Sequence, residues 1–598
     1  MTRNGTGTLA IVVDDRRIPE TEAELVARAR DGDADAFEQL AGAHADPLPR
    51  TRLALPDRHN PASAPRLAVI QGFSVPLRSH PGADAALVSD GVRLAAMTPA
   101  DQRPENRSGH SAVYRYGSNP SEGADVSTAT YDVIVIGAGP AGEVLAGRLA
   151  GKGHDVAIIE SGLVGGECSY YACMPSKALL RPAQALAEAR RVPGAAQAVT
   201  GDLDVATVLA RRDEIIGGLD DSGQVPWLES RGVTLIRGHG RLDGERRVRV
   251  GDQVLQARTA VVIAVGSGAA IPPVPGLADA SPWTNREITT ATSIPGRLVI
   301  LGGGAVGVEM AQAYATLGSQ VTLVEAEDRL IPREEPFAGE ELRQALTGRG
   351  VDIRTGARAQ AVRRKGPQVT LILSDGQNIQ GEEILVATGR RARTQDLGLE
   401  TVGLQPGRVI QVTDRLRVPG LPWLYAIGDV NGRSLLTHMG KYQAHVLSET
   451  LDGHAAAVSR DNATAPRVIF TDPQVAAAGL TLRAALAQGL DARAYDVPSS
   501  GTAGAAFYGI NTPGTARIVV NEQRGVIAGA TFTGTDVAEW LQAATIAIIS
   551  KTPVELLWQA VPAFPTRSEI WLKLLERREA VLSREHAATQ RPTAKPAA

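Results

Sequence analysis

One sequence unit occurs twice in this chain, and it constrains the fold more than any other feature. In the first copy, the apolar run Asp132–Ile136 leads directly into the glycine-rich turn Gly137–Gly142. A helical stretch follows, and a second apolar run, His154–Glu160, ends in an acidic residue. Strand, glycine turn, helix and strand with a terminal acid are together typical of a dinucleotide-binding unit with parallel strands.

Each part of this unit has a separate task in binding. Glycines let the backbone approach a diphosphate, and the N-terminus of the following helix stabilises its charge. The acid at the end of the second strand, Glu160, is predicted to accept a hydrogen bond from a ribose hydroxyl. The residues predicted to form the turn are Gly137, Gly139, Pro140, Ala141 and Gly142.

The second copy consists of the strand Arg297–Leu301, the turn Gly302–Gly307, and the strand Gln320–Val324 followed by Glu325. Two dinucleotide sites in one chain imply electron transfer between two cofactors. An acid at the end of the second strand repels the extra phosphate of NADPH, so this site is predicted to prefer NADH. The next residues, Ala326–Asp328, contain no arginine that would bind that phosphate.

Both cysteines of the chain, Cys168 and Cys173, lie between the two units in the segment Gly165–Lys177. If this segment opens a helix, their spacing of about one turn lets the two sulfurs meet. A helix N-terminus also favours a thiolate, and Pro175 suits a first helical turn. Two buried structural cysteines are the alternative. The dinucleotide motif just upstream favours a redox-active dithiol.

Three further apolar runs end in turns. Ala260–Ser267 and Glu383–Arg390 are predicted strands that end in tight glycine turns, and Leu424–Asp429 ends in a carboxylate. Asp429 on its own is most simply a structural turn residue. In company with the first glycine motif, it is interpreted as a ligand of a flavin's sugar chain.

Composition excludes several other classes. A chain of 598 residues is expected to form several domains. Lys and Arg number 62 against 65 Asp and Glu, so the charge balance indicates no nucleic-acid partner. No apolar run is long enough for a membrane span. Two cysteines do not make a secreted disulfide scaffold, and a cytoplasmic location is therefore predicted.

From about Tyr131 to Arg584 the sequence resembles the flavin-dependent pyridine nucleotide–disulfide oxidoreductases, which include lipoamide dehydrogenase, glutathione reductase and mercuric reductase. The pieces that carry the resemblance are Gly165–Lys177, the two glycine motifs, Ala387–Gly389, Ala426–Asp429, Phe470–Pro473 and Ala478–Thr481. The last two are similar to the opening of the family's dimerisation domain, so a homodimer is implied.

The resemblance also implies cofactors and roles. It implies FAD at Gly137–Gly142, Glu160, Lys177, Gly240 and Asp429, and NAD at Gly302, Gly304, Val306, Gly307, Glu309, Glu325 and Gly389. By position, Cys173 is expected next to the flavin ring and Cys168 is expected to attack the substrate. Lys177 is expected to pair with Glu309 near the flavin nitrogen that receives hydride.

The implied fold class is α/β, with two Rossmann-like dinucleotide-binding domains and a C-terminal α+β dimerisation domain. The expected divisions are a largely disordered extension at 1–129, an FAD domain with the disulfide at 130–285, an NAD domain at 286–395, a segment completing the FAD site at 396–465, the dimerisation domain at 466–584 and a disordered tail at 585–598. Within the extension, Glu22–Leu40 is predicted to form one or two short helices. An extension without function, or a misplaced start codon, is favoured over a fused partner-binding segment.

The sequence departs from the family pattern near its C-terminus. Family members that act on disulfides carry His-Pro-Thr-x-x-Glu, whose His is a general acid–base from the partner subunit. Here Phe564 takes the place of that His, and Glu569 remains without an imidazole to orient. Such a loss costs on the order of a hundredfold in rate. Mercuric reductase also lacks this His, but its C-terminal cysteine pair is absent here.

The function predicted from the sequence is passage of hydride from NADH through FAD to the Cys168–Cys173 disulfide. From there the electrons go to a small acceptor, namely a disulfide, a quinone or a metal ion, and no resident metal is predicted. One alternative is a diaphorase in which flavin reduces the acceptor directly. A more remote one is a redox-sensing protein whose N-terminal segment binds a partner.

Overall fold

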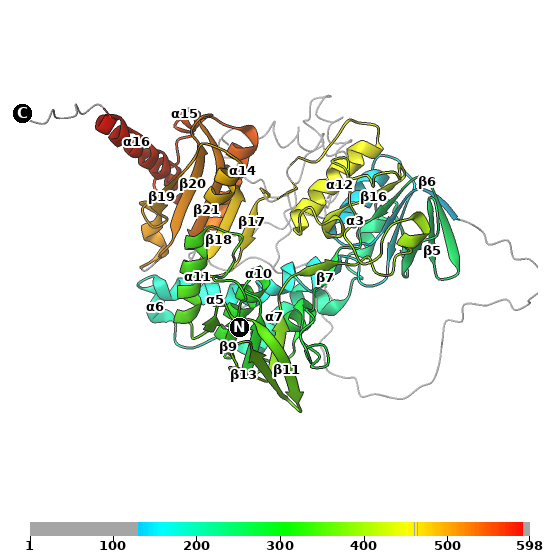
Figure 1. Cartoon of the computed structure of the whole chain (residues 1–598), viewed down its shortest axis with the longest axis horizontal. Coiled ribbons are helices and arrows are strands. Elements are labelled where there is room, and N and C mark those ends of the chain that lie inside the picture. The colour runs from blue at the N-terminus through cyan, green and yellow to red at the C-terminus, as the bar shows by residue number, and fades with distance from the viewer. Residues whose placement is uncertain (1–128, 460, 463, 511, 590–598) are drawn as a thin grey trace, which may run out of the picture. The chain divides into compact units, whose positions relative to one another are not determined.

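The structure is a computed structural model, and it describes residues 129–459, 461–462, 464–510 and 512–589 (Figure 1). The predicted helices in Glu22–Leu40 and the predicted disorder before residue 129 lie outside these residues. Contacts within the chain separate Met1–Asn119 from Pro120–Ala598, so the described residues all belong to the second unit.

The first glycine motif lies at the centre of a sheet of seven strands. Its parallel members are β3 (Thr234–Arg237), β2 (Val156–Glu160), β1 (Ala129–Ile136), β6 (Gln253–Ile263) and β16 (Leu424–Ala426). β5 (Arg247–Val250) and β4 (Gly240–Leu242) extend one edge antiparallel. Because β16 pairs with β6, the residues after β16 reach the same end of the sheet as the glycine turn after β1.

Two helices cover this end of the sheet and pack on each other: α3 (Pro140–Ala150), which begins in the glycine turn, and α12 (Thr437–Leu451) (Figure 1). They meet closely, since a Cβ atom placed on Gly440 would lie 3.2 Å from the Cβ atom of Ala141. The close crossing keeps α12 beside the N-terminus of α3.

The second glycine motif lies in a parallel sheet of four strands in the order β10-β9-β8-β14. Their bounds are Asp352–Arg354, Gln320–Val324, Arg297–Leu301 and Glu383–Val386, and α10 (Ala305–Thr316) connects β8 to β9. An antiparallel sheet, β11 (Ala359–Lys365), β12 (Gln368–Leu373) and β13 (Asn378–Gly381), accompanies it. The strands predicted at 297–301 and 320–324 agree with the structure.

The chain passes from the first sheet to the second between β6 and β8, and it returns between β14 and β16. These two connecting segments, the outward and the return crossing, pair with each other through one strand each. β7 (Ser267–Ala269) on the outward path is antiparallel to β15 (Arg390–Ala392) on the return path. Residues more than a hundred positions apart therefore lie side by side next to the first sheet.

The C-terminal region is an antiparallel sheet of five strands in the order β17-β18-β21-β20-β19. The bounds are Arg467–Ile469, Gln474–Gly479, Val526–Gly534, Thr515–Asn521 and Ala492–Pro498, and α14 (Leu541–Ser550) and α16 (Ile570–Thr589) pack on it (Figure 1). β20 and β21 form an antiparallel hairpin. The prediction that a disordered tail begins at residue 585 is wrong, because α16 continues to Thr589.

The other helices are short or connect these sheets. They are α4 (Gly166–Tyr170), α5 (Cys173–Arg191), α6 (Ala195–Ala198), α7 (Val205–Ile215), α8 (Val225–Glu229), α9 (Asn285–Thr290), α11 (Pro336–Gly348), α13 (Leu482–Ala487) and α15 (Val554–Leu557). The 3₁₀ turns are η2 (Gly217–Leu219), η3 (Leu399–Val402), η4 (Gly428–Asn431), η5 (Gly504–Tyr508), η6 (Val537–Trp540) and η7 (Arg567–Glu569). Within the described part of the chain, no helix has both the length and the apolar character that crossing a membrane requires.

Candidate active site

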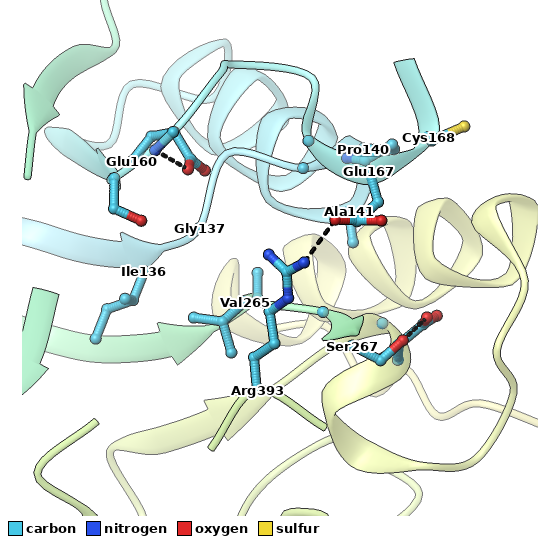
Figure 2. A pocket seen from close by; sticks show the side chains of 18 of the residues that line it. Ile136, Gly137, Pro140, Ala141, Glu160, Glu167, Cys168, Val265, Ser267 and Arg393 are labelled. Atoms are coloured by element: carbon cyan, nitrogen blue, oxygen red, sulfur yellow. Dashed lines mark hydrogen bonds and ion pairs between the residues drawn. The ribbon is translucent and has the colours of Figure 1, made fainter. Parts of the chain in front are cut away.

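A cavity of about 640 Å³ lies at the end of the first sheet (Figure 2). Its walls come from the turn after β1, the end of β2, the residues before β4, the end of β6, both crossings and the turn after β16. The predicted FAD residues among its lining are Gly137, Gly139, Pro140, Ala141, Glu160, Gly240 and Asp429. The structure thus brings together around one cavity residues that the sequence spreads over almost three hundred positions.

The glycine turn forms a cradle that side chains would fill. Gly137 has a φ of +105°, and a Cβ atom there would lie 2.6 Å from the carbonyl oxygen of Ala264. A Cβ atom on Gly142 would lie 2.0 Å from the carbonyl oxygen of Gly137, whereas one on Gly139 would meet nothing within 4 Å. Backbone and the N-terminus of α3 therefore face the cavity directly, as a diphosphate requires.

Glu160 ends β2 with both carboxylate oxygens fixed by the backbone. Oε2 accepts a hydrogen bond from the N–H of Ala138, and Oε1 accepts one from the N–H of Gly162, both at 2.7 Å. Glu160 lines the cavity, and each of its oxygens can accept a further hydrogen bond. This arrangement fits a ribose hydroxyl.

Asp429, just after β16, also lines the cavity. The Ser267 hydroxyl donates to its carboxylate, and Arg390 Nε lies 3.6 Å from it. Burial raises the pKa of Asp429, and Ser267 and Arg390 oppose that rise. The carboxylate is thus fixed at the wall where a sugar chain would pass.

The dithiol segment differs from the single helix that the cysteine spacing suggested. Cys168 lies on α4, the helix ends at Tyr170, and Cys173 is the first residue of α5. The two thiols are still close enough for each to shift the pKa of the other. Cys173 Sγ also lies 3.4 Å from the Thr437 hydroxyl of α12. Cys173 stands at the N-terminus of the long helix α5, which favours its thiolate, whereas Cys168 lies in the five-residue helix α4.

The two thiols therefore differ in acidity. The hydrogen bond from Cys168 lowers the pKa of Cys173 to about 6, with help from Thr437 and the charge of Lys177 and against the effect of burial. The same hydrogen bond, together with burial, raises the pKa of Cys168. Of the two, Cys173 is the more acidic thiol.

Lys177, one turn along α5 from Cys173, contacts the second dinucleotide unit. Its ammonium lies 2.8 Å from Glu309 Oε2, the pairing expected from the sequence. The side chain of Glu309 on α10 is only 6% exposed, and its Oε1 accepts a hydrogen bond from the N–H of Phe470 at 2.9 Å. A buried carboxylate held in this way fixes the position of the lysine charge.

The second glycine motif has the same backbone form as the first. Gly302 has a φ of +108°, and a Cβ atom on Gly307 would lie 1.8 Å from the carbonyl oxygen of Gly302. Glu325 accepts from the N–H of Gly303 at 2.5 Å and from the N–H of Glu327 at 2.8 Å. Two other predicted NAD residues, Gly304 and Gly389, have open space where a Cβ atom would lie. The side chain of a third, Val306, is exposed.

Phe564 and Glu569 lie in the C-terminal region. Phe564 is 77% exposed, and Glu569 accepts a hydrogen bond from the N–H of Gly504 at 3.4 Å. Within the described residues, no hydrogen bond or ion pair joins either side chain to the dithiol. Their predicted place beside Cys168 depends on a partner subunit.

Several residues at the cavity escaped the sequence reasoning. Glu167, directly before Cys168, binds Arg286 and Arg393, which lie 119 and 226 positions away. Thr437 and Arg390 also line the cavity. Glu167 stands inside the dithiol motif, so its position was visible, but nothing in the local sequence indicates partners that arrive from the two crossings.

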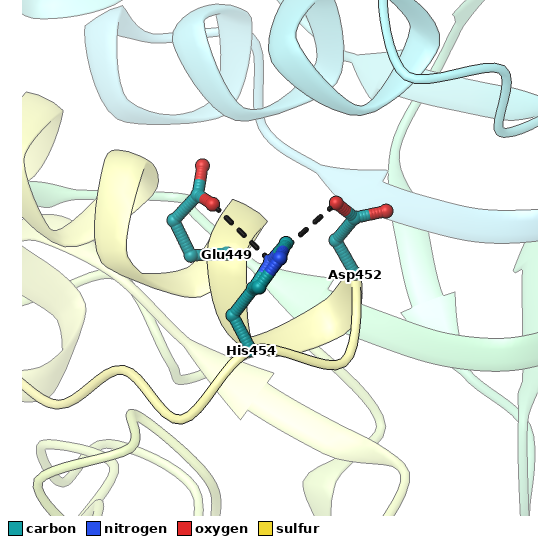
Figure 3. Close-up of side chains that lie close together, drawn as sticks. All are labelled: Glu449, Asp452 and His454. Atoms are coloured by element: carbon teal, nitrogen blue, oxygen red, sulfur yellow. Dashed lines mark ion pairs between the residues drawn. The ribbon is translucent and has the colours of Figure 1, made fainter.

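A cluster of possible metal ligands lies away from this cavity, where Glu449, Asp452 and His454 approach one another (Figure 3). The Lys152 ammonium lies 3.0 Å from an oxygen of Glu449 and 3.0 Å from one of Asp452. A cationic side chain thus already balances the two carboxylates, so the cluster is an ion-pair network at the α3–α12 contact.

Two dinucleotide cradles and a dithiol beside the first define a class of enzyme, and known protein families match it. The family model described as pyridine nucleotide-disulphide oxidoreductase matches residues 131–445, and that of the family's dimerisation domain matches residues 465–575. The chain therefore belongs to the pyridine nucleotide-disulphide oxidoreductases. This confirms the predicted family, the α/β fold class and an oxidoreductase activity.

Similar proteins include two named enzymes. Dihydrolipoyl dehydrogenase of Thermus scotoductus is 33% identical over 449 residues, which is 74% of this chain and 95% of the relative. Mercuric reductase of Staphylococcus aureus is 28% identical over 468 residues, 77% of this chain and 85% of the relative.

Solved structures agree. The HOCl-induced flavoprotein disulfide reductase RclA of Escherichia coli matches with a TM-score of 0.67 and 25% identity, covering 75% of this chain and 99% of that one. LpdA of Mycobacterium tuberculosis matches with a TM-score of 0.66 and 26% identity over the same shares. The family is FAD-dependent and uses NAD(P)H.

Proposed function

We propose that this enzyme passes two electrons from NADH, through FAD in the cavity, to the Cys168–Cys173 disulfide and on to a small acceptor. The observation that carries the proposal is the pair of cysteines at adjoining helix ends, Cys168 on α4 and Cys173 at the start of α5, beside a cavity lined by the first glycine turn. FAD, when bound, supplies the two-electron relay between nicotinamide and disulfide. The remaining steps belong to side chains of this chain.

The two cysteines have different roles in the transfer of electrons to the acceptor. Two electrons and one proton convert the disulfide into the Cys168 thiol and the Cys173 thiolate. With a disulfide acceptor, Cys168 loses its proton, forms a mixed disulfide with one acceptor sulfur and releases the other as a thiol. The Cys173 thiolate then attacks Cys168, which restores the disulfide and releases the second thiol. The sum consumes one NADH and one proton for each acceptor disulfide.

Lys177 and Glu309 act as a fixed charge pair beside this chemistry. The lysine charge lowers the pKa of Cys173, and the buried carboxylate keeps the ammonium in place. We assign to Lys177 the stabilisation of negative charge on Cys173, and to Glu309 the positioning of Lys177.

The nicotinamide site favours NADH over NADPH in this proposal. Backbone N–H groups hold both oxygens of Glu325 at the end of β9. A carboxylate fixed there accepts hydrogen bonds from ribose hydroxyls and repels a 2′-phosphate.

The acceptor class follows from what the C-terminal segment lacks. Phe564 cannot transfer a proton, so a dithiol such as dihydrolipoamide is a poor partner. A quinone or a metal ion has less need of such a base, and a small disulfide remains the third candidate acceptor. Relatives named mercuric reductase and a Cu(II) complex of RclA support the metal-ion option. The dimerisation domain supports a homodimer. A cytoplasmic location stays a prediction.

The test is steady-state NADH oxidation against a panel of disulfides, quinones and Hg(II). Cys168→Ser should reduce turnover with the preferred acceptor by about a hundredfold or more, because the attacking sulfur is gone. The control is Ser169→Ala, which changes only the neighbouring hydroxyl and should leave turnover unchanged. Full turnover in Cys168→Ser would mean that electrons leave directly from flavin, as in a diaphorase.

A further inference from the structure

Three arginines line the same wall of the FAD cavity, and all come from the crossings between the two dinucleotide units: Arg286, Arg390 and Arg393. Arg390 is already occupied, because it donates to the hydroxyl and carbonyl oxygens of Ser267 at 2.7 and 2.8 Å. Arg286 and Arg393 instead meet at one carboxylate, that of Glu167.

Glu167 holds both guanidinium groups. Its Oε1 accepts from Arg286 Nε at 2.7 Å and from Arg393 Nη2 at 2.5 Å, the second of which is drawn in Figure 2. Its Oε2 accepts from Asn285 Nδ2 at 2.6 Å, and Arg390 lies 3.9 Å away. Burial alone would raise the pKa of Glu167, but Arg393, Asn285 and Arg286 outweigh it and hold that pKa below its usual range. Glu167 is therefore an ionised anchor.

The two arginines keep unused donors. Within the described part of the chain, the Nε and Nη1 of Arg393 and the Nη1 of Arg286 have no hydrogen-bond partner. Arg286 also stacks on the ring of Tyr171, with 4.4 Å between its guanidinium carbon and the ring centroid. Figure 2 shows the Arg393 guanidinium rising from the cavity floor toward Ala141 and Glu167, below the N-terminus of α3. Guanidinium groups with free N–H donors at a cavity wall are suited to phosphate oxygens.

The charge distribution of the cavity points the same way. Its acidic side chains are already engaged: Glu160 by backbone N–H groups, Glu167 by arginines, and Asp429 by Ser267. The first turn of α3 contributes an acidic residue, Glu143, and no basic one. The helix N-terminus alone offers only partial positive charge to a dianionic diphosphate. The opposing arginines supply full charges.

We propose that Arg286 and Arg393, held by Glu167, bind the diphosphate of FAD. They form the second side of its binding site, facing the N-terminus of α3. The proposal rests on the FAD cavity described above. Because the two arginines come from the outward and the return crossing, bound FAD would tie both crossings to the N-terminus of α3.

The test measures retention of FAD by the full-length holoenzyme. On dilution, released FAD regains its fluorescence, which gives Kd without NADH or an acceptor. Arg393→Met should raise Kd roughly tenfold or more, the worth of one charge-assisted hydrogen bond, and adding Arg286→Met should raise it further. Arg391→Met is the matched control, since Arg391 is exposed and absent from the cavity lining. It should leave Kd within about twofold, because a surface charge contributes little.

Salt dependence separates a phosphate contact from a structural effect. The wild-type Kd should rise with ionic strength, and Arg393→Met should flatten that rise, whereas Arg393→Lys should keep most of it. A Kd in Arg393→Met equal to that of wild type would overturn the proposal. So would a weakened Kd with the wild-type salt dependence, because the arginine would then act only through the fold. Neither result depends on the identity of the acceptor, so failure here is distinct from failure of the proposed function.

Discussion

The two dinucleotide-binding regions of this protein have nearly the same backbone and very different walls. In both, the last glycine of the turn packs against the first, with a Cβ atom at 142 or 307 placed 2.0 or 1.8 Å from a carbonyl oxygen. In both, the acid at the end of the second strand accepts from the N–H of the turn's second residue. The sequence repeat is therefore a structural repeat.

The walls differ because they come from different parts of the chain. At the FAD region, distant segments contribute Arg286, Arg390 and Arg393 to a cavity. At the NAD region, Glu325 is only 9% exposed, and Leu330 lies so close that a Cβ atom on Gly303 would be 2.7 Å from it. The local motif thus predicts that a dinucleotide binds, and side chains from elsewhere determine which one.

The largest expected effect separates the two cradles. Gly142→Ala must displace the backbone of the first turn, so flavin content should fall to about a tenth or less of wild type, a change worth at least 1.4 kcal/mol. Gly307→Ala makes the same clash in the second turn and should retain flavin while the KM for NADH rises by about a hundredfold. Flavin-to-protein absorbance ratios and steady-state kinetics measure both.

Gly348→Ala is the matched control for this pair, since a Cβ atom there meets nothing within 4 Å. It should change neither flavin content nor KM. Loss of flavin from Gly307→Ala would contradict the idea that the two cradles serve separate cofactors.

The next effect concerns the two acids. Replacing Glu325 by Ala together with Ala326→Arg should shift the kcat/KM ratio toward NADPH by about tenfold, because repulsion is exchanged for a phosphate partner. Glu160→Ala removes the corresponding acid of the FAD region and should leave that ratio unchanged. A wild-type enzyme with the higher kcat/KM for NADPH would refute the role given to Glu325.

A smaller gain is expected in the C-terminal segment. Phe564→His restores a base, but Glu569 must still hold the ring in its productive tautomer. Oxidation of dihydrolipoamide near neutral pH should therefore rise only several-fold, while quinone reduction stays the same. High dihydrolipoamide activity in the unmutated enzyme would contradict the claim that it lacks a base at this position, since some other residue would then act as the base.

The smallest effect is a shift in pH dependence. The pKa of Cys173 is lowered to about 6, so its thiolate is present above that pH and is lost as the pH falls through it. In the NADH-reduced enzyme, a Cys173 thiolate beside FAD should give a long-wavelength absorbance. This absorbance should fall as the pH falls through the pKa of Cys173. Thr437→Val removes one hydrogen bond to Cys173 and should move the midpoint to higher pH. An unchanged midpoint would mean that Thr437 does not stabilise the thiolate.

The sequence predicted what is local or repeated. Strands at 132–136 and 297–301 and the glycine turns follow from short-range patterns, and the Lys177–Glu309 pair followed from resemblance. The break between α4 and α5 was missed because spacing alone does not show where a helix ends. The arginines around Glu167 were missed because they reach it from α9 and from the residues after β15, and these are tertiary contacts that no local pattern shows.

Anaerobic reduction by NADH tests the central claim most directly. Wild-type enzyme should develop a long-wavelength absorption band as the electrons pass to the disulfide and the Cys173 thiolate forms beside FAD. Cys168→Ser keeps the Cys173 thiolate but has no disulfide to receive electrons, so it should show such a band before NADH is added and lose it on reduction. Cys173→Ser should lack it. If wild type and Cys173→Ser give the same reduced spectrum, the dithiol does not receive the electrons and the account is contradicted.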